Sequence, residues 1–240
     1  MIALEDKCTG CLRCIDYCPM SAIEKVRDTR LVAIDQGECV DCGVCYRAGV
    51  CPTDALFQPP SPWPRSVRGT FSNPLAEHPE TRIPGRGTEE MKTNDVTGRY
   101  AAGYAGMAVE LGRPGTGARF HDVQRVAQAL AALGIEFEPK NPVTFLMVDK
   151  AAGTINPEVL DEKVLSAIVE FTVPLEKVEA VLSTLRRVAG EVNTVFSVDI
   201  ITRARPDGTA PTVELLGDIG QPFSINGKTN MGLGRPRAAV

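Results

Sequence analysis

The sequence predicts an α+β protein in two unequal parts joined by a proline-rich segment. All eight cysteines fall within residues 8–51 of the 240-residue chain, and residues 58–90 contain seven prolines. The sequence after residue 90 alternates between apolar strand patterns and amphipathic helix patterns. We therefore expect four segments: a cysteine-rich domain (1–57), a linker or wrapping arm (58–90), a split βαβ sandwich (91–216) and a Gly- and Pro-rich C-terminal arm (217–240).

Composition indicates a globular protein with a small acidic excess. Apolar residues make up 43% of the chain and charged residues 23%, which is enough to build a core. Of the net charge of -4, residues 1–57 contribute -3 from nine acids and six bases, and the remaining 20 bases and 21 acids contribute -1. Phosphate binding needs concentrated Lys and Arg, so a nucleic-acid partner is not expected.

The start of the chain and its hydropathy predict a cytoplasmic protein. The sequence MIALEDKC carries acids where a secretory signal has a basic segment followed by a long apolar one. No run of about 18 apolar residues occurs, so we expect no membrane-spanning helix.

The cysteines form an internal repeat. The two runs are Cys8-x2-Cys11-x2-Cys14-x3-Cys18-Pro19 and Cys39-x2-Cys42-x2-Cys45-x5-Cys51-Pro52. Short strands are expected near Ile2–Leu4 and Leu31–Ile34, with one helical turn opened by the proline of each half. A segment of this length is too short for an ordinary hydrophobic core, so something other than packing must hold it.

Three cysteines at two-residue spacings can turn around one centre, while a fourth, set apart and followed by proline, points away. This pattern resembles that of two-cluster bacterial ferredoxins, in which the fourth cysteine of each run binds the other cluster. The resemblance covers residues 1–57, under a quarter of the chain. It implies two [4Fe-4S] clusters, the first held by Cys8, Cys11, Cys14 and Cys51 and the second by Cys39, Cys42, Cys45 and Cys18.

The second run departs from the family pattern. Five residues, Tyr46–Val50, replace the usual three before Cys51. We expect this loop to bulge, and Gly49 can take the backbone conformation that a bulge needs.

Structural zinc and a disulfide framework are the two alternatives. A four-cysteine zinc site uses two pairs separated by a longer loop and has no use for three evenly spaced cysteines plus a proline. A disulfide framework fits a secreted chain, for which the N-terminal sequence gives no signal. The spacing therefore favours iron and sulfur.

Residues 58–90 are expected to form neither helix nor sheet, because their prolines fix φ and remove backbone donors. The segment is either a flexible spacer or an extended arm that packs on a neighbour. In the second case the contacts are expected from the apolar residues Trp63, Phe71, Leu75 and Ile83.

From about residue 91 the pattern predicts alternating strands and helices. The expected elements are a strand over Tyr104–Leu111, a helix over Ala118–Leu133 ended by Gly134, strands over Val143–Val148 and Ser166–Val173, a helix from Pro174 to Gly190, and a strand over Val192–Thr202. This order is that of the ferredoxin-like α+β sandwich, in which two helices cover one face of a four-stranded antiparallel sheet. Ligand-binding modules of the ACT type share this topology.

Three further patterns carry little functional signal. Gly227-Lys228-Thr229 resembles the end of a phosphate-binding loop, but Pro222 stands where the first glycine should be. The Gly-rich residues 112–117 precede a helix N-terminus, which favours anions, although a tight strand-to-helix turn explains them. His78 and His121 lie in no motif and are expected to be ordinary polar residues. We expect no catalytic residue.

The favoured function is an iron-sulfur electron-transfer protein or subunit that serves a larger redox enzyme, for example a flavoprotein. Such clusters pass single electrons, and the acidic front domain predicts a low potential and a basic partner surface. The C-terminal domain and the two arms are expected to supply docking or oligomer contacts. One alternative is a redox- or metabolite-responsive regulator whose ACT-like domain binds a small ligand. Another is an oxidoreductase component that shares a flavin or substrate site with a partner subunit.

Overall fold

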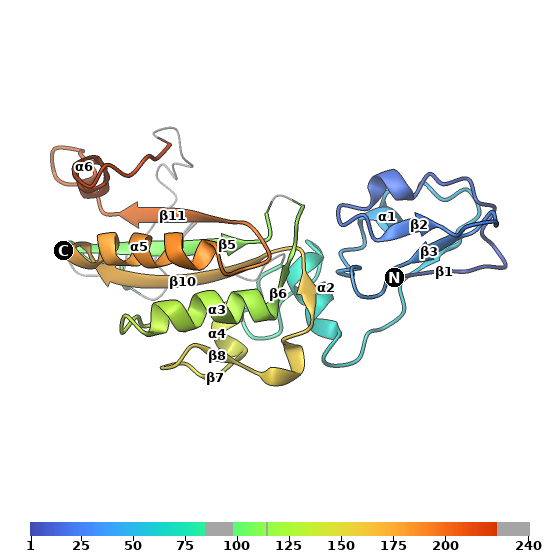
Figure 1. Ribbon diagram of the computed structural model, residues 1–240, viewed down its shortest axis with the longest axis horizontal. Coiled ribbons are helices and arrows are strands. Elements are labelled where there is room, and N and C mark those ends of the chain that lie inside the picture. The colour runs from blue at the N-terminus through green and yellow to red at the C-terminus, as the bar shows by residue number, and fades with distance from the viewer. Residues whose placement is uncertain (85–97, 114, 225–240) are drawn as a thin grey trace.

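The computed structural model describes residues 1–84, 98–113 and 115–224. The cysteine-rich part lies at one end and a larger α+β body at the other (Figure 1). Helix α2 (Ser66–Ser72) lies on the side of the body that faces the cysteine-rich part. Among the described residues, no helix is long and apolar enough to cross a membrane. The α+β class predicted from the sequence is confirmed.

The cysteine-rich part consists of two small antiparallel strand pairs and two short helices. Strand β1 (Ile2–Ala3) pairs with β4 (Leu56–Phe57), and β2 (Ile23–Lys25) pairs with β3 (Val32–Ile34). The helices are η1 (Ile15–Tyr17) and α1 (Val44–Arg47).

The prediction of a helical turn after each Cys-Pro pair is wrong. The turns η1 and α1 come before Cys18 and Cys51, and a strand follows each proline. The reason lies in two hydrogen bonds. The N–H groups of Ala22 and Ala55, which would bond a carbonyl oxygen in a helix, instead donate to the sulfurs of Cys18 and Cys51, both at 3.2 Å.

The described part of the proline-rich segment, residues 58–84, packs on the body and contains a helix that was not expected. Helix α2 fits between Pro64 and Pro74, where no proline interrupts the backbone hydrogen bonds. Its residues Val67 and Phe71 are buried in the core of the body. Of the other apolar residues expected to make contacts, Ile83 is partly buried, while Trp63 and Leu75 are exposed.

The sheet of the body has three strands in the order β10-β5-β11. The bounds are β5 (Tyr104–Leu111), β10 (Ala167–Pro174) and β11 (Phe196–Thr202). Both outer strands run antiparallel to β5 and therefore parallel to each other. Helix α5 (Val178–Ala189) connects them across β5, which is the split βαβ arrangement.

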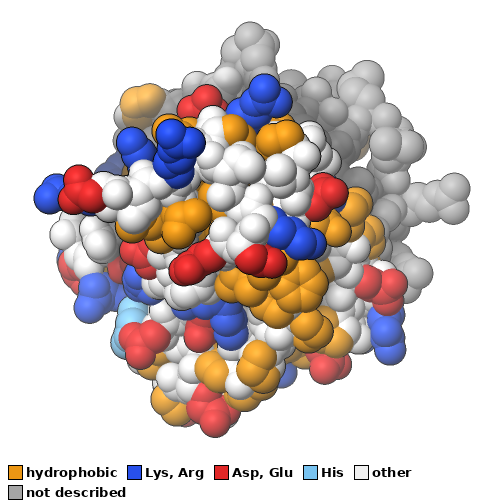
Figure 2. All heavy atoms as spheres, turned by 90° about the vertical axis from the view of Figure 1, so that its right-hand side faces the viewer, with side chains coloured by type: hydrophobic (Ala, Val, Ile, Leu, Met, Phe, Trp, Pro, Cys, Tyr) orange, Lys and Arg blue, Asp and Glu red, His pale blue; other side chains and the backbone are white. Residues whose placement is uncertain are grey.

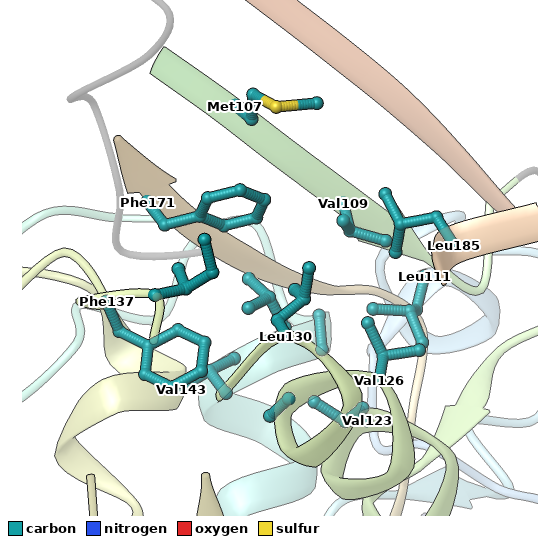
Figure 3. Close-up of a cluster of buried hydrophobic side chains, with 14 of the residues drawn as sticks. Met107, Val109, Leu111, Val123, Val126, Leu130, Phe137, Val143, Phe171 and Leu185 are labelled. Atoms are coloured by element: carbon teal, nitrogen blue, oxygen red, sulfur yellow. The ribbon is translucent and has the colours of Figure 1, made fainter. Parts of the chain in front are cut away.

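One face of this sheet carries the main core, shown in Figure 3. Helix α3 (Phe120–Ala131) and α5 lie on this face, with α3 contributing a continuous apolar stripe. The stripe is produced by apolar residues spaced three and four apart. The facing side chains include Met107, Val109 and Leu111 from β5, Val123, Val126 and Leu130 from α3, and Leu185 from α5.

The prediction that Val143–Val148 forms a strand of the sheet is wrong, so the sheet has three strands and not the expected four. Residues Pro142–Phe145 form helix α4, because Asn141 caps its N-terminus by accepting the Val143 N–H at 2.8 Å and Pro142 suits the first helical position. Strand β7 (Met147–Asp149) then pairs with β8 (Thr154–Ile155) in a separate hairpin. In the described chain no fourth strand pairs with the outer edge of β10, which makes an isolated bridge between Phe171 and Phe137.

The remaining elements connect these layers. They are β6 (Ala118–Arg119) paired with β9 (Lys163–Val164), the single turns η2 (Pro157–Val159) and η3 (Leu175–Lys177), and helix α6 (Pro211–Asp218). The helix expected from Ala118 begins two residues later because β6 pairs with β9. Helix α6 includes Gly217 and Asp218, where a loop was expected. The Gly227-Lys228-Thr229 pattern lies outside the described residues.

Candidate metal centre

The eight cysteines line two pockets, four in each. Site one is lined by Cys8, Cys11, Cys14 and Cys51. Site two is lined by Cys18, Cys39, Cys42 and Cys45. The structure thus brings together the two sets that the ferredoxin resemblance implied, with Cys18 and Cys51 each placed in the pocket of the opposite half.

The two pockets have the donor set that an iron-sulfur cluster requires. All eight cysteines are free of disulfide bonds. Each pocket combines four thiols with apolar side chains, such as Leu12 and Val32 at site one and Ile23 and Ile34 at site two. Within the described ranges, no three His, Cys, Asp or Glu side chains form a group that could hold a single metal ion. The thiols surround a volume, and soft thiolate ligands in such a pocket fit a [4Fe-4S] cluster.

Left-handed backbone conformations curl each cysteine run around its pocket. The residues on either side of the middle cysteine have positive φ in both runs: Gly10 (68°) and Leu12 (63°) flank Cys11, while Asp41 (52°) and Gly43 (70°) flank Cys42. Such conformations are unfavourable for a side chain such as Leu, whereas Asp tolerates them better. Gly10 and Gly43 are typical of this conformation, but nothing in the sequence predicts it at Leu12.

The five-residue spacing before Cys51 is accommodated locally. Helix α1 takes up Val44–Arg47, and Gly49 has a φ of +61°, the left-handed conformation expected for it. Cys51 still reaches the pocket of site one. The longer loop therefore leaves the four-cysteine arrangement intact.

Burial raises the pKa of the cysteine thiols, and hydrogen bonds from backbone N–H groups lower it. Burial raises the pKa of Cys14, Cys39 and Cys42, and raises that of Cys45 to about 11. Burial also acts on Cys51, but the backbone N–H groups around its sulfur outweigh it and lower its pKa. Since iron binds thiolates, cluster binding must release protons from the buried thiols.

The two sites differ in how far their cysteines are exposed to solvent and in their contacts with the body. Site one includes Cys11, which is exposed, whereas Cys42 and Cys45 of site two are buried. Leu165 of the body packs on the apolar cluster at site two. The Gly-rich turn after β5 also lies here, and a Cβ at Gly117 would fall 2.6 Å from Met20 Cε. Gly117 also has a φ of +72°, and this left-handed conformation accounts for a glycine at that position of the turn.

Several charged residues near site two were not expected from the sequence. Arg65 donates to Asp41 at 2.9 Å, and Lys163 pairs with Glu38. Arg68, also on the arm, bonds the loop before Cys39. Arg65 and Arg68 are three residues apart. In a helix between Pro64 and Pro74 this spacing places them on the same face, so a helix prediction there would have indicated the pair.

The two histidines lie away from both pockets. His78 is buried between Phe71 and Phe145, and its Nδ1 accepts the N–H of Glu80 at 3.2 Å. Burial lowers the pKa of His78. His121 pairs with Asp161 on the surface.

Comparison with known proteins assigns the cysteine-rich part alone. Residues 7–56 match a family model described as a 4Fe-4S dicluster domain. A ferredoxin of Methanothermococcus thermolithotrophicus is 40% identical over 53 residues, 21% of this chain and 83% of that protein. An uncharacterized ferredoxin of Methanocaldococcus jannaschii is 38% identical over 59 residues, 24% of this chain and 74% of that protein. An uncharacterized protein of Porphyra purpurea is 36% identical over 53 residues, 20% of this chain and 68% of that protein. No solved structure matches.

Proposed function

The chain belongs, through residues 7–56, to the 4Fe-4S dicluster ferredoxins, and on this premise we propose that it passes single electrons to or from a larger redox enzyme. Two [4Fe-4S] clusters held by the eight cysteine thiolates would supply one-electron redox chemistry, for which no covalent bond needs to form or break. The observation that carries the proposal is the division of eight cysteines into two four-thiol pockets.

We assign the thiolates of Cys8, Cys11, Cys14 and Cys51 to the first cluster, and those of Cys18, Cys39, Cys42 and Cys45 to the second. Each set lines one pocket, with apolar side chains between the thiols. The N–H groups of Ala22 and Ala55 hold the sulfurs of Cys18 and Cys51 in place. Such contacts orient ligands and tune the potential.

Electron exchange with a partner is best supported at site one. Its ligand Cys11 is exposed, while the body covers site two. Only the turn η1 separates Cys14 of site one from Cys18 of site two, so the chain links the sites by a short path. Cys14 and Cys18 would thus hold the two clusters close together along the chain, as a relay between an exposed and a covered cluster requires.

We also propose that the partner presents a basic surface to the acids around site one. Two acids of the cysteine-rich part, Glu38 and Asp41, pair with cations of the arm and body. Figure 2 shows acidic, basic and apolar side chains interspersed on the outer face of the cysteine-rich part. The exposed acids beside the cysteines of site one in the sequence are Glu5, Asp6, Asp16 and Asp54. Electrostatic steering by these acids alone would be modest.

Anaerobic purification followed by iron and sulfide analysis tests the proposal. Two clusters require about eight irons and eight sulfides per chain, and the reduced protein should show the low-temperature EPR spectrum of two interacting clusters. A content of about four irons would contradict it, as would activity of the purified chain alone on an organic substrate. Location in the cytoplasm stays a prediction, in keeping with the reducing conditions that free thiols need.

The pockets and the comparisons favour neither alternative function. A metabolite-responsive regulator would place a ligand site on the body, which has no recognised family. A shared flavin or substrate site would need a partner subunit. Both remain predictions.

A further inference from the structure

Cations from outside the cysteine-rich part cap the loop that leads into Cys39. The guanidinium group of Arg68 donates to the carbonyl oxygens of Gln36 at 2.7 Å and Cys39 at 2.8 Å. Arg65 adds a bond to Gln36 O at 3.0 Å, and Arg119 adds one to Gly37 O at 3.4 Å. The loop is thus held by side chains that lie from 29 to 82 residues away in the sequence.

Arg68 is the most buried of these three arginines. It is 6% exposed, lies in the middle of α2, and pairs on its other side with Glu162 of the body. A buried guanidinium is stable only when its donors are satisfied, and here two loop carbonyls and a carboxylate satisfy them. The guanidinium group of Arg68 therefore lies between the Cys39 loop and the carboxylate of Glu162.

The internal repeat provides a comparison within the same molecule. Both loops share a backbone bond, from Cys39 N to Asp35 O at 2.9 Å and from Cys8 N to Leu4 O at 3.0 Å. The loop before Cys8 is held differently, by the Thr53 hydroxyl on Lys7 O at 2.7 Å. In the part of the chain that the structure describes, no side-chain cation bonds the carbonyls of the loop from Leu4 to Cys8. The arginine cap is specific to site two.

We propose that Arg68 is a positioning residue for the cluster at site two, an inference that rests on the assignment of Cys39 to that cluster. Its Nη1 donates to the loop carbonyls while its Nε donates to Glu162, and the planar guanidinium thereby fixes the backbone that carries Cys39. Its positive charge also favours the reduced state, because reduction adds one negative charge to the cluster. Arg68 should therefore slow the loss of iron from site two and raise the potential of that site, with little effect on site one.

The test uses the full chain with both clusters, in three variants: Arg68→Gln, Arg68→Lys and Glu162→Gln. Arg82→Gln is the control, since this arm arginine has a side chain that is 78% exposed and pairs with exposed Glu77. One readout is the rate of iron release to a chelator. The second is an EPR-monitored titration with dithionite, which supplies the electrons and is itself oxidised.

Arg68→Gln should speed one of two iron-release phases roughly tenfold, the lower end of typical outer-shell effects. It should also lower one of two midpoint potentials. Arg68→Lys should speed the same phase, because an ammonium lacks the planar donor array of a guanidinium. It should lower the midpoint potential less than Arg68→Gln does, because the ammonium keeps the positive charge. Glu162→Gln should raise that potential. Lys7→Gln, beside Cys8, should lower the other midpoint and so identify which belongs to site one.

Equal changes at both sites, or behaviour of Arg68→Gln like that of Arg82→Gln, would overturn the inference while leaving the two-cluster proposal intact. A wild-type chain with a single cluster would instead overturn the proposed function. Should Arg68→Gln fail to fold, Arg68→Lys and Glu162→Gln carry the test. Midpoint-potential shifts of the same sign in these two variants would contradict the role proposed for Arg68.

Discussion

Cys14 and Cys18 are four positions apart in the chain, yet they line different pockets. This relationship gives a direct test of the ligand sets by paired substitutions. Cys18→Ser combined with Cys42→Ser alters one site, so about four irons should remain of about eight. Cys18→Ser combined with Cys11→Ser alters both sites and should leave almost none. Iron and sulfide analysis distinguishes the two cases, and equal iron contents in the two double variants would refute the assignment.

The packed arm predicts a large stability difference between two of its apolar residues. Phe71 is 3% exposed and its ring meets that of Phe120 edge-on, with centroids 5.2 Å apart. Phe71→Ala should therefore lower the free energy of unfolding by about 3–5 kcal/mol. Leu75, which is 71% exposed, is the control, and Leu75→Ala should change it by no more than about 0.5 kcal/mol. Denaturant titration measures both, and equal small effects would support a flexible spacer.

His78 predicts a dependence of stability on pH. Burial holds its pKa in the folded state below the ordinary value of 6.5, so the unfolded chain binds the proton more readily. The contribution is fully present above pH 6.5 and declines as the pH falls below that value. Protonation would also remove the Nδ1 lone pair that accepts the N–H of Glu80.

The difference between wild type and His78→Gln isolates this contribution from acid effects on the clusters. Thermal unfolding near pH 7.5 and near pH 5.5 should show a smaller loss of stability on acidification in His78→Gln, although that variant is less stable overall. An identical pH dependence in both proteins would show that His78 does not contribute it.

The Gly-rich turn after β5 predicts unequal costs for two glycines of like conformation. Gly112 (φ +88°) and Gly115 (φ +68°) both occupy the left-handed region, where alanine costs about 1–2 kcal/mol. A Cβ at Gly112 would lie 2.8 Å from the Leu165 carbonyl oxygen, whereas the nearest atom to a Cβ at Gly115 is 3.6 Å away. Gly112→Ala should thus be the more destabilising by about 1–3 kcal/mol in denaturant unfolding.

Features with a strong local signal could be predicted from the sequence. The predicted strand Tyr104–Leu111 matches β5 residue for residue, because a long apolar run between turns has few alternatives. The ferredoxin resemblance also implied that Cys18 and Cys51 belong with the cysteines of the opposite run, and in the structure each lines the pocket of that run. In contrast, the strand expected at Val143–Val148 is wrong, because the Asn141 cap and Pro142 start a helix within the apolar run.

Contacts between distant segments could not be predicted. Glu38 and Lys163 are 125 positions apart, and no periodicity in either segment indicates that they meet. The same is true of Arg68 and the carbonyl of Cys39. Local patterns determine strands and helices, whereas the joining of the arm, the body and the cysteine-rich part depends on tertiary packing.

The two sites differ in solvent exposure, and they should therefore differ in sensitivity to oxygen. Oxygen reaches exposed thiolates first, and Cys11 is exposed while Cys42 and Cys45 are buried beside the body. Damage should therefore begin at site one and leave, for a time, a chain with the inner cluster only. Such a chain would keep its covered cluster but would have lost the site that we propose for electron exchange with a partner.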